Sequence, residues 1–555
     1  MLLVVLGWQW AGRPIPVTPD APTDRFNSLS FAPYRPGESP LTGHYPTEAE
    51  IDSDLALLAP KVNAIRTYAS AEGIVDVPGL AKQHGIKVWE GIWLSGDRAR
   101  NQIEIAAGVA QANRYPGTID RVVVGNEVLL RRDLPPAELI GDIDEVRSQV
   151  SQPVTYADVQ DFWEEFPEVA RHVDIVTVHL LPYWENNPTD IDGAVAHIDA
   201  VYQHMHQLFP GKPIAIGETG WPSRGRWRDA AAPSIVNEAK FIREFMVLAA
   251  REGFQYNLIE AFDQNWKAIG EGTVGSRWGI WTADRRPKFP LRGPVSNDPD
   301  WPNAAALSVG CALLLIMVGF SGPKLPLRVA ALLSCCATIL GTSVGYGVSE
   351  TWPDLYTLDL GLAASVNLPV QELLAALAVR RFRSVLLGHR PRRSRNGNDA
   401  TNFARALVLM QWPRVSLDAL FDDLNFIFVW VALMLEILLV LDGRYRDFPT
   451  PAFVTPVAVV VLRAVLADLP CSGGGREEIW LGLSLVGFAV FNIFEETLAN
   501  TQAMVWDGMA LTMALAQLLR LVRFQAKGGK NLLFVNKKKQ KNLGNLGLEV
   551  SAPIE

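Results

Sequence analysis

Two stretches decide the fold of this 555-residue chain: Val122-Val-Val-Gly-Asn-Glu127 and Ile214-Ala-Ile-Gly-Glu-Thr-Gly-Trp-Pro-Ser223. Each places one glutamate, Glu127 or Glu218, where a β-branched apolar run meets small residues. Such runs favour strands, and barrels of parallel strands carry their chemistry at the carboxyl ends of those strands. The two glutamates are separated by roughly three βα units of about 30 residues each, so we expect them to face one another across one barrel mouth.

The rest of the first half of the chain repeats the same alternation of short strand-like runs and helical patterns. Eight such repeats predict a closed parallel barrel. The predicted fold class is therefore α/β, a (β/α)8 TIM barrel, followed by an all-α multi-span transmembrane domain. The expected strands are Ser28–Tyr34, Ala64–Tyr68, Lys87–Trp93, Arg121–Glu127, Val154–Asp158, Asp174–His179, Pro213–Glu218 and Tyr256–Asp263.

A pair of carboxylates facing one cavity indicates glycosidic-bond chemistry. One carboxyl group must be protonated to release the leaving oxygen, while the other must be ionised to attack the anomeric carbon. The sequence contains no Gly-rich phosphate loop, no Cys-x-x-Cys and no His-Glu-x-x-His, so we predict neither a cofactor nor a metal. Ser223 lacks the Gly-x-Ser-x-Gly context of an acyl-transferring serine.

The motifs around both glutamates resemble those of glycoside hydrolase family 17, the β-1,3-glucanases and glucanosyltransferases. The resemblance covers roughly Asn27 to Leu291. The sequence resembles the bacterial, membrane-linked branch of this family, which is associated with periplasmic β-glucans, more than it resembles the plant enzymes. The stretches that carry the resemblance are Gly125–Glu127, Gly217–Ser223, Glu260–Lys267, Trp278–Trp281 and Pro287–Lys288 for the family, and Asn126–Arg132 and His179–Trp184 for the branch.

The resemblance implies a retaining mechanism with Glu127 as general acid/base and Glu218 as nucleophile. It implies that Asn126 binds the sugar 2-hydroxyl, although a turn asparagine at a strand end is the alternative. It also implies that Tyr183 donates its hydroxyl to Glu218. The chain departs from the plant members, which have Tyr-Pro-Tyr where this sequence has Leu181-Pro182-Tyr183.

Further side chains near strand ends are expected to bind the sugar. Aromatic rings stack on the apolar faces of sugars, and polar groups at strand ends fix their orientation. A structural histidine is the alternative at His179. The predicted stacking residues are Trp184, Trp221 and Trp266, and the predicted polar lining consists of Arg66, Tyr68, Tyr156, Asp158, His179, Asp263 and Lys267.

The composition changes near Trp301 to long apolar stretches broken by arginine clusters, which indicates a membrane domain. We divide the chain into an apolar stub and Pro-rich linker (1–26), the barrel (27–293), a transmembrane domain of about seven helices (294–526) and a basic, disordered tail (527–555). The stub is either the end of an anchor or a frayed apolar terminus. The predicted spans are Asn303–Phe320, Leu327–Tyr346, Leu358–Val379, Leu424–Leu441, Pro451–Leu469, Ile479–Ile493 and Met504–Val522.

Charge sets the expected orientation of these spans. Basic runs at Arg380–Arg395 and Lys527–Lys541 should face the cytoplasm and the acidic loop Glu350–Asp354 should face outward, which puts the barrel in the periplasm, anchored to the inner membrane. The formal charge of −8 gives no reason to expect nucleic acid.

The sequence therefore predicts a multi-pass enzyme that remodels β-glucan. We favour a transglycosylase that elongates or branches β-1,3/β-1,6-glucan, with a lipid membrane and a glucan synthase as partners. A β-1,3-glucan hydrolase is the first alternative, and a non-catalytic glucan-binding or export component is the second.

Overall fold

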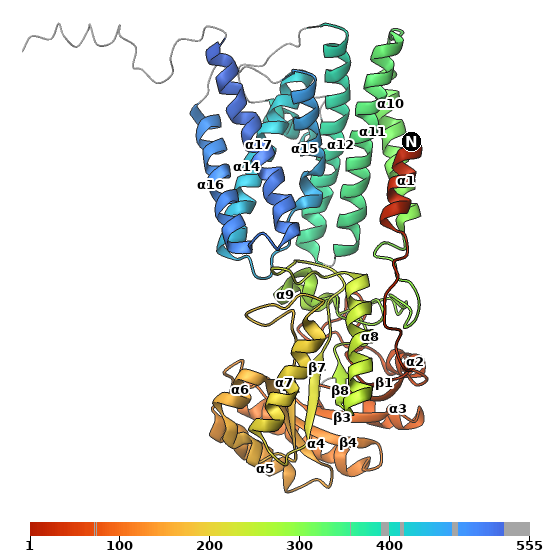
Figure 1. The fold of residues 1–555 in the computed structure, drawn as a ribbon, viewed down its shortest axis with the longest axis vertical. Coiled ribbons are helices and arrows are strands. Elements are labelled where there is room, and N and C mark those ends of the chain that lie inside the picture. Colours follow the sequence, from red (N-terminus) through yellow and green to blue (C-terminus); the bar gives the residue numbers. More distant parts are fainter. Residues whose placement is uncertain are drawn as a thin grey trace, which may run out of the picture.

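The computed structural model describes residues 1–526 except 72, 74, 356, 390–398, 411–415 and 469–475. The predicted tail (527–555) and most of the loop after Arg380 that carries basic residues lie outside this description. The chain forms a barrel joined to a bundle of helices whose axes run roughly parallel to one another (Figure 1).

Eight parallel strands close into a barrel in chain order, each hydrogen-bonded to its neighbours and the last to the first. This confirms the predicted TIM barrel. The strand bounds are β1 Phe26–Ser30, β2 Val62–Arg66, β3 Lys87–Ile92, β4 Ile119–Asn126, β5 Val154–Val159, β6 Ile175–His179, β7 Ile214–Thr219 and β8 Gln255–Leu258.

The helices between the strands begin and end at residues that satisfy free backbone groups. Helix α2 begins with a capping box, in which the side chain of Thr47 and that of Glu50 each accept from the other's backbone N–H. Helix α8 ends at Gly253, whose φ of 74° is accessible to glycine without strain. The helices around the barrel are α2 Glu48–Leu58, α3 Val77–Gln83, α4 Arg98–Arg114, α5 Pro136–Arg147, α6 Gln160–Glu165, α7 Ala194–Leu208, α8 Ile235–Glu252 and α9 Ala268–Gly275.

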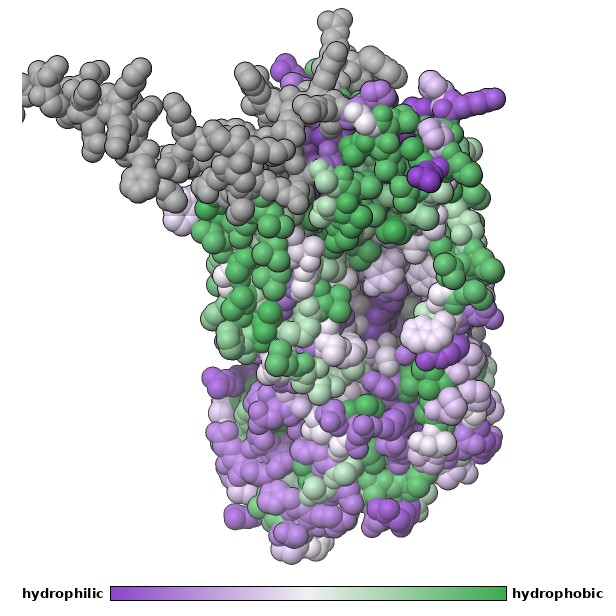
Figure 2. Space-filling view, turned by 45° about the horizontal axis from the view of Figure 1, so that its top comes forward, coloured by the Kyte–Doolittle hydropathy of each residue, from purple (hydrophilic) through white to green (hydrophobic). Residues whose placement is uncertain are grey.

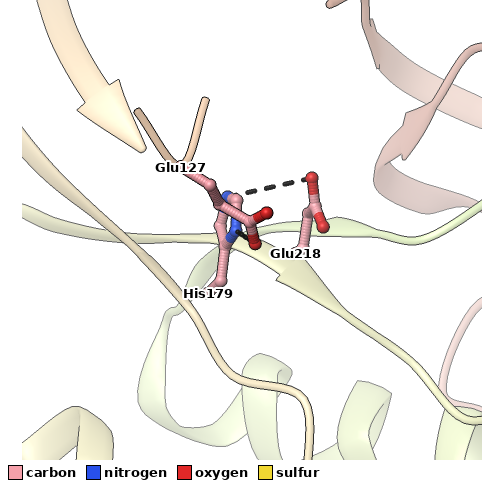
Figure 3. A group of neighbouring side chains, drawn as sticks. All are labelled: Glu127, His179 and Glu218. Atoms are coloured by element: carbon pink, nitrogen blue, oxygen red, sulfur yellow. Dashed lines mark hydrogen bonds and ion pairs between the residues drawn. The ribbon is translucent and has the colours of Figure 1, made fainter. Parts of the chain in front are cut away.

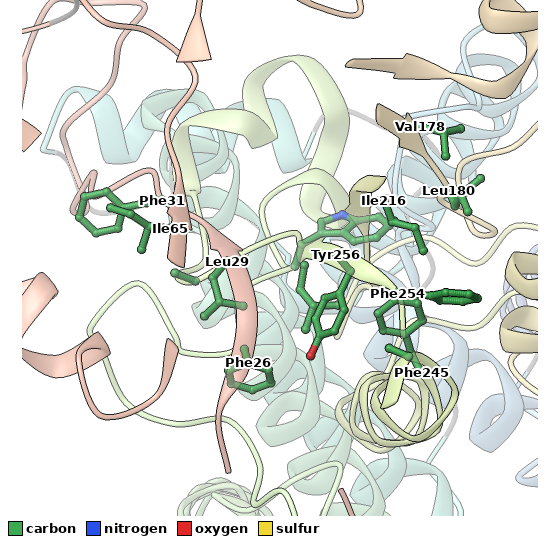
Figure 4. Packing of buried hydrophobic residues seen from close by; sticks show 14 of the residues in the cluster. Phe26, Leu29, Phe31, Ile65, Val178, Leu180, Ile216, Phe245, Phe254 and Tyr256 are labelled. Atoms are coloured by element: carbon green, nitrogen blue, oxygen red, sulfur yellow. The ribbon is translucent and has the colours of Figure 1, made fainter. Parts of the chain in front are cut away.

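The largest apolar core lies between the strands and these helices (Figure 4). Phe245 of α8 meets Tyr256 of β8 edge to face, with ring centroids 5.0 Å apart. Leu29 and Ile216, from β1 and β7, are completely buried in the same cluster. Each such side chain stabilises the fold by about 1.5–3 kcal/mol relative to exposure, so the barrel is a rigid support for residues at its strand ends.

The second half of the chain is helical and its surface is apolar, whereas the surface of the barrel is mostly hydrophilic (Figure 2). Its helices are α10 Trp301–Phe320, α11 Leu327–Thr351, α12 Leu358–Leu386, α13 Asp399–Val408, α14 Leu417–Leu441, α15 Thr450–Val465, α16 Arg476–Glu496 and α17 Thr501–Ala526.

Within the described residues, five helices are long and apolar enough to cross a membrane: α10, α11, α12, α14 and α16. The sequence predicted about seven. Helix α15 has only 16 residues, fewer than the ~20 that span a bilayer. Helix α17 is long enough but carries Asp507 and Gln517 among its apolar residues. Both helices nevertheless pack within the bundle.

The N-terminal apolar residues form a short helix, α1 Leu2–Ala11, that lies along α10 (Figure 1). Its Trp8 donates to the hydroxyl of Ser308 at 3.0 Å and stacks on Tyr346 with ring centroids 6.4 Å apart. The stub is thus packed against the bundle and is not frayed. The chain then crosses to the barrel, pairing Ile15 with Val295 on the way.

Candidate active site

Glu127 follows β4 at a sharp change of backbone direction. Gly125 and Glu127 both have positive φ, 85° and 54°, and the N–H of Glu127 donates to the carbonyl oxygen of Ala157 in β5 at 2.8 Å. A residue other than glycine with positive φ is uncommon, and such conformations gather at functional sites. This turn holds the Glu127 carboxylate at the mouth of the barrel.

Glu218 lies within β7 and is 5% exposed. The preceding residue must be glycine, because a Cβ at Gly217 would lie 2.5 Å from Thr177 and 2.8 Å from the ring of His179. This close approach of β6 and β7 sets His179 in register with Glu218. Strand packing therefore places His179 beside the carboxylate.

The two carboxylates meet at His179 (Figure 3). Its Nδ1 lies 3.0 Å from Oε1 of Glu127, and its Nε2 lies 3.8 Å from Oε1 of Glu218. One oxygen from each glutamate and one ring nitrogen all lie within 4.8 Å of one another. Retaining glycosidases hold their carboxyl groups about 5–5.5 Å apart, whereas inverting enzymes need about 6.5–9.5 Å. Carboxylate oxygens within 4.8 Å of each other lie closer than the inverting range and are compatible with a retaining pair.

Arg66 and Tyr68 hold Glu218. The buried Arg66 donates to Oε1 of Glu218 at 3.1 Å, and the Tyr68 hydroxyl donates to the same oxygen at 2.8 Å. Arg66 also donates to Oδ1 of Asn126 at 2.5 Å, which leaves the Nδ2 donor of Asn126 for another partner. These two donors fix the position of the Glu218 carboxylate at the mouth, as an attacking group requires.

Opposing influences act on the pKa of Glu127. Burial raises it, but the hydrogen bond and charge of His179, followed by the charges of Arg131 and Arg66, outweigh burial and bring the pKa below its usual value. If a bound sugar broke the bond to His179, burial would again raise the pKa and favour the protonated form that a general acid needs.

The donor set of Glu127, His179 and Glu218 is also one that can hold a metal ion. Here the guanidinium of Arg66 already lies 3.1 Å from Glu218 and 3.4 Å from Nε2 of His179. Repulsion between this buried cation and a second one disfavours a metal ion at the same place.

Two predictions about aromatic residues were wrong. The Tyr183 hydroxyl donates to the carbonyl oxygen of Arg226 at 2.5 Å and not to Glu218, which takes its hydroxyl bond from Tyr68. Trp221 is fully buried in the core, and its Nε1 donates to the carbonyl oxygen of Ala232 at 3.0 Å, so it offers no face to a sugar.

Three predicted polar lining residues are buried supports. The Tyr156 hydroxyl bonds Asp158 and accepts from the N–H of Leu129, which holds the segment after Glu127 in place. Asp263 accepts from the N–H of Gly279 at 2.9 Å and pairs with Lys288 at 3.0 Å, which fastens the loop after β8.

The remaining predicted residues lie nearer the mouth. Lys267 pairs with Glu260 at 2.9 Å. Burial lowers the pKa of Lys267, but the charges of Glu260 and Glu271, with a smaller contribution from Glu218, outweigh burial and raise it. Trp266 and Trp184 are partly exposed; Trp266 lies edge to face with Tyr34 at 6.0 Å, and Trp184 stacks on Trp278 at 6.2 Å. Both tryptophans keep surface for a ligand.

One acidic residue beside the two glutamates, Glu271 in α9, is not among the predicted lining residues. Burial, followed by weaker effects of Glu127 and Glu218, raises its pKa despite the opposing charge of Lys267. A second buried acid, Glu90 in β3, lies toward α3 and α4 and not at the pair of glutamates: it accepts from Thr67 and Ser70, and burial raises its pKa to about 7, with weaker contributions from Glu104 and Asp76.

An eight-stranded parallel barrel with two carboxylates at the ends of β4 and β7, spaced for glycosidic-bond chemistry, defines a glycoside hydrolase domain. Residues 28–279 match the family described as the BtgE/BtgC glycoside hydrolase domain. The barrel is thus a domain of glycoside hydrolase family 17, and the resemblance seen in the sequence is confirmed at the level of the family.

Relatives and solved structures resemble the barrel half of the chain. Glucan 1,3-beta-glucosidase BGL2 of Candida albicans is 27% identical over 267 residues, which cover 43% of this chain and 85% of that protein. A glucan 1,3-beta-glucosidase of Arthroderma benhamiae is 29% identical over 286 residues, covering 46% and 89%. The glycoside hydrolase family 17 beta-1,3-glucanosyltransferase of Rhizomucor miehei aligns with a TM-score of 0.43 and 24% identity, covering 48% of this chain and 97% of that one. These relatives are fungal, so the similarity to a bacterial branch stays a prediction.

Proposed function

We propose that this chain is a membrane-anchored retaining enzyme that acts on β-1,3-glucan and transfers the cleaved glycosyl group to another sugar. The observation that carries the proposal is the pair Glu127 and Glu218, with one oxygen of each within 4.8 Å of the other and with Glu218 held by Arg66 and Tyr68. The substrate class is taken from relatives named as glucan 1,3-beta-glucosidases.

In the first step an oxygen of Glu218 attacks the anomeric carbon while Glu127 gives its proton to the departing glycosidic oxygen. The result is a glucosyl ester on Glu218 and a free sugar chain. In the second step Glu127, now ionised, takes a proton from an acceptor hydroxyl, whose oxygen displaces Glu218. A sugar acceptor gives elongation or a β-1,6 branch, and water gives hydrolysis.

A barrel outside the cytoplasm agrees with the distribution of charge. Lys324 and Arg328 lie near the turn between α10 and α11, and Arg383 donates to the carbonyl oxygen of Pro323 in that turn. The acidic residues Glu350 and Asp354 lie at the opposite end of α11, where both pair with Arg224 of the barrel. Positive charge at the end far from the barrel supports an inner-membrane protein with a periplasmic barrel and with the domain boundary after residue 293.

The test is mass spectrometry of the products that the full chain, purified in detergent, forms from labelled β-1,3-gluco-oligosaccharides, with Glu218→Gln as control. Products longer than the donor that are absent with the variant support transfer, and linkage analysis then separates β-1,3 from β-1,6 bonds. Shorter products alone would make the enzyme a hydrolase. Inactivity of the wild-type protein would overturn the enzymatic proposal in favour of glucan binding or export.

A further inference from the structure

A pocket of about 310 Å³ lies where the barrel meets the helical half. The barrel contributes the loops after β6 and β7, and the helical half contributes the end of α14, the loop after it and the end of α16. Neither half could form this pocket alone. The loop after β6 starts at Leu180, directly after His179, and the loop after β7 starts two residues after Glu218, so both barrel segments of the pocket continue from residues of the active site.

Charged groups of both signs line the pocket in equal number: three arginines and three carboxylates. Arg226 pairs with Glu496, and Asp229 accepts from the hydroxyl of Thr497 at 3.0 Å. The other two arginines, Arg228 and Arg444, form no ion pair within the described part of the chain.

These two arginines instead donate to backbone carbonyl oxygens of the loop after β6. Arg228 donates to Tyr183 at 2.6 Å, and Arg444 donates to Trp184 at 3.2 Å. Each guanidinium has five N–H donors, so most of its donors stay available to a ligand. Burial, and then the charge of Arg444, lower the pKa of Arg228, which agrees with two like charges held close together.

This balance of charge selects the kind of ligand. An anion would meet the carboxylates of Glu495, Glu496 and Asp229, and a cation would meet the arginines. A neutral molecule with many hydroxyl groups can donate to the carboxylates and accept from the guanidinium groups at the same time. The pocket therefore suits a carbohydrate.

Two aromatic residues, one from each half of the chain, are linked to the lining residue Arg444, which precedes Tyr445 and donates to the carbonyl oxygen of Trp184. Trp184 of the barrel lies edge to face with Tyr445 of the loop after α14, with ring centroids 5.8 Å apart. Tyr445 is 40% exposed. The backbone of Tyr445 also packs so closely on Gly272 of α9 that no side chain would fit there. Because α9 carries Glu271, the loop of the helical half backs the rim of the catalytic mouth.

We propose that this pocket is a subsite for the same glucan chain that occupies the catalytic mouth, with Trp184 and Tyr445 stacking on sugar faces and Arg228, Arg444 and Glu495 bonding hydroxyl groups. The inference rests on the proposed function. It makes the helical half part of the substrate-binding surface and gives long chains an advantage over short ones.

The experiment compares kcat/KM for polymeric laminarin with kcat/KM for laminaritriose, using the full chain in detergent. Tyr445→Ala should lower the ratio of these two values about fivefold, the effect of one lost stacking contact. Tyr445→Phe keeps the ring and should restore the ratio. Trp352→Ala removes another exposed aromatic of the helical half, outside the pocket, and should leave the ratio at the wild-type value.

Three outcomes would overturn the inference while leaving the proposed function intact. One is an unchanged ratio with Tyr445→Ala, and another is an equal loss on both substrates. The third is inhibition by inorganic phosphate that disappears in Arg228→Gln, which would assign the pocket to an anion. A wild-type protein without activity on either glucan would instead defeat the proposed function.

Discussion

Replacing His179 with glutamine tests the electrostatic account of Glu127. The substitution removes the ring that lies 3.0 Å from Oε1 of Glu127 but leaves the carboxylate buried. A hydrogen bond to a charged group contributes about 1.5–3 kcal/mol, and one pKa unit corresponds to about 1.4 kcal/mol. The pKa of Glu127 should therefore rise by roughly one to two units, since burial now acts with less opposition.

The direction in which the pH profile moves follows from the proposed role of Glu127 as general acid. In the proposed first step Glu127 must be protonated, so kcat/KM should fall on the alkaline side of its pKa. A raised pKa moves this limb of the pH profile to higher pH by the same one to two units. The measurement is kcat/KM for laminaritriose against pH, for the full chain in detergent.

His172→Gln is the matched control, because His172 forms a similar pair with Asp144 at 2.9 Å on the outer surface of the barrel. It should not move the alkaline limb. An alkaline limb that stays in place in His179→Gln, or that moves to lower pH, would refute the assignment of Glu127 as the acid whose pKa His179 depresses.

Three further outcomes are expected. Glu218→Gln should lower turnover at least about 10³-fold because it removes the proposed nucleophile. Formation of a covalent intermediate by this variant, seen by intact-protein mass spectrometry, would contradict the assignment. Tyr68→Phe should lower kcat about tenfold and Tyr183→Phe much less, since of these two hydroxyls the one on Tyr68 bonds Glu218. A larger loss of kcat with Tyr183→Phe than with Tyr68→Phe would show that Tyr183 holds Glu218 after all. Because burial raises the pKa of Glu90 to about 7, folding binds a proton there, and stability falls as pH rises from about 4.5 through 7. Glu90→Gln should flatten that fall in thermal unfolding curves, and an unchanged slope would show that Glu90 does not titrate in this range.

The barrel and the positions of its two glutamates could be predicted because both depend on local pattern. A β-branched run ended by small residues favours a strand, and regular alternation with helices leaves a parallel sheet few ways to close. The strand-end position of Glu127 and Glu218 then follows directly from the sequence.

The side chains that bond these glutamates are determined by packing across the barrel, and this packing cannot be read from spacing along the chain. Tyr68 follows β2 and Tyr183 follows β6, so the sequence alone allows either hydroxyl to be the one that bonds Glu218. The choice is made by Trp221 and Trp278, whose rings lie edge to face with Tyr183 and bury it away from the mouth. The same burial explains why Trp221 was wrongly expected to stack on sugar.

The number of membrane-spanning helices was harder to predict, because the length of an apolar run does not fix the length of the helix that it forms. Pro449 precedes α15 and Ala467 follows it with positive φ, so its apolar run yields only 16 helical residues. Such a helix can lie in the bundle, packed against α11 and α17, without meeting the length of a bilayer.

Ion pairs between the barrel and the helical half hold the two parts of the chain in one relative orientation. Arg226, in the loop after β7, is 3% exposed and pairs with Glu496 at the end of α16. Removing one partner of a buried pair costs about 3–5 kcal/mol, because the other charge stays uncompensated. Arg224, in the same loop, is tied to Glu350 and Asp354 of the helical half.

These pairs hold the loop that follows Glu218 against the bundle, so the barrel cannot turn its mouth away without breaking them. The helical half therefore helps to set the position of the loop that directly follows the proposed nucleophile, which is a physical reason for the close contact between the barrel and the apolar bundle.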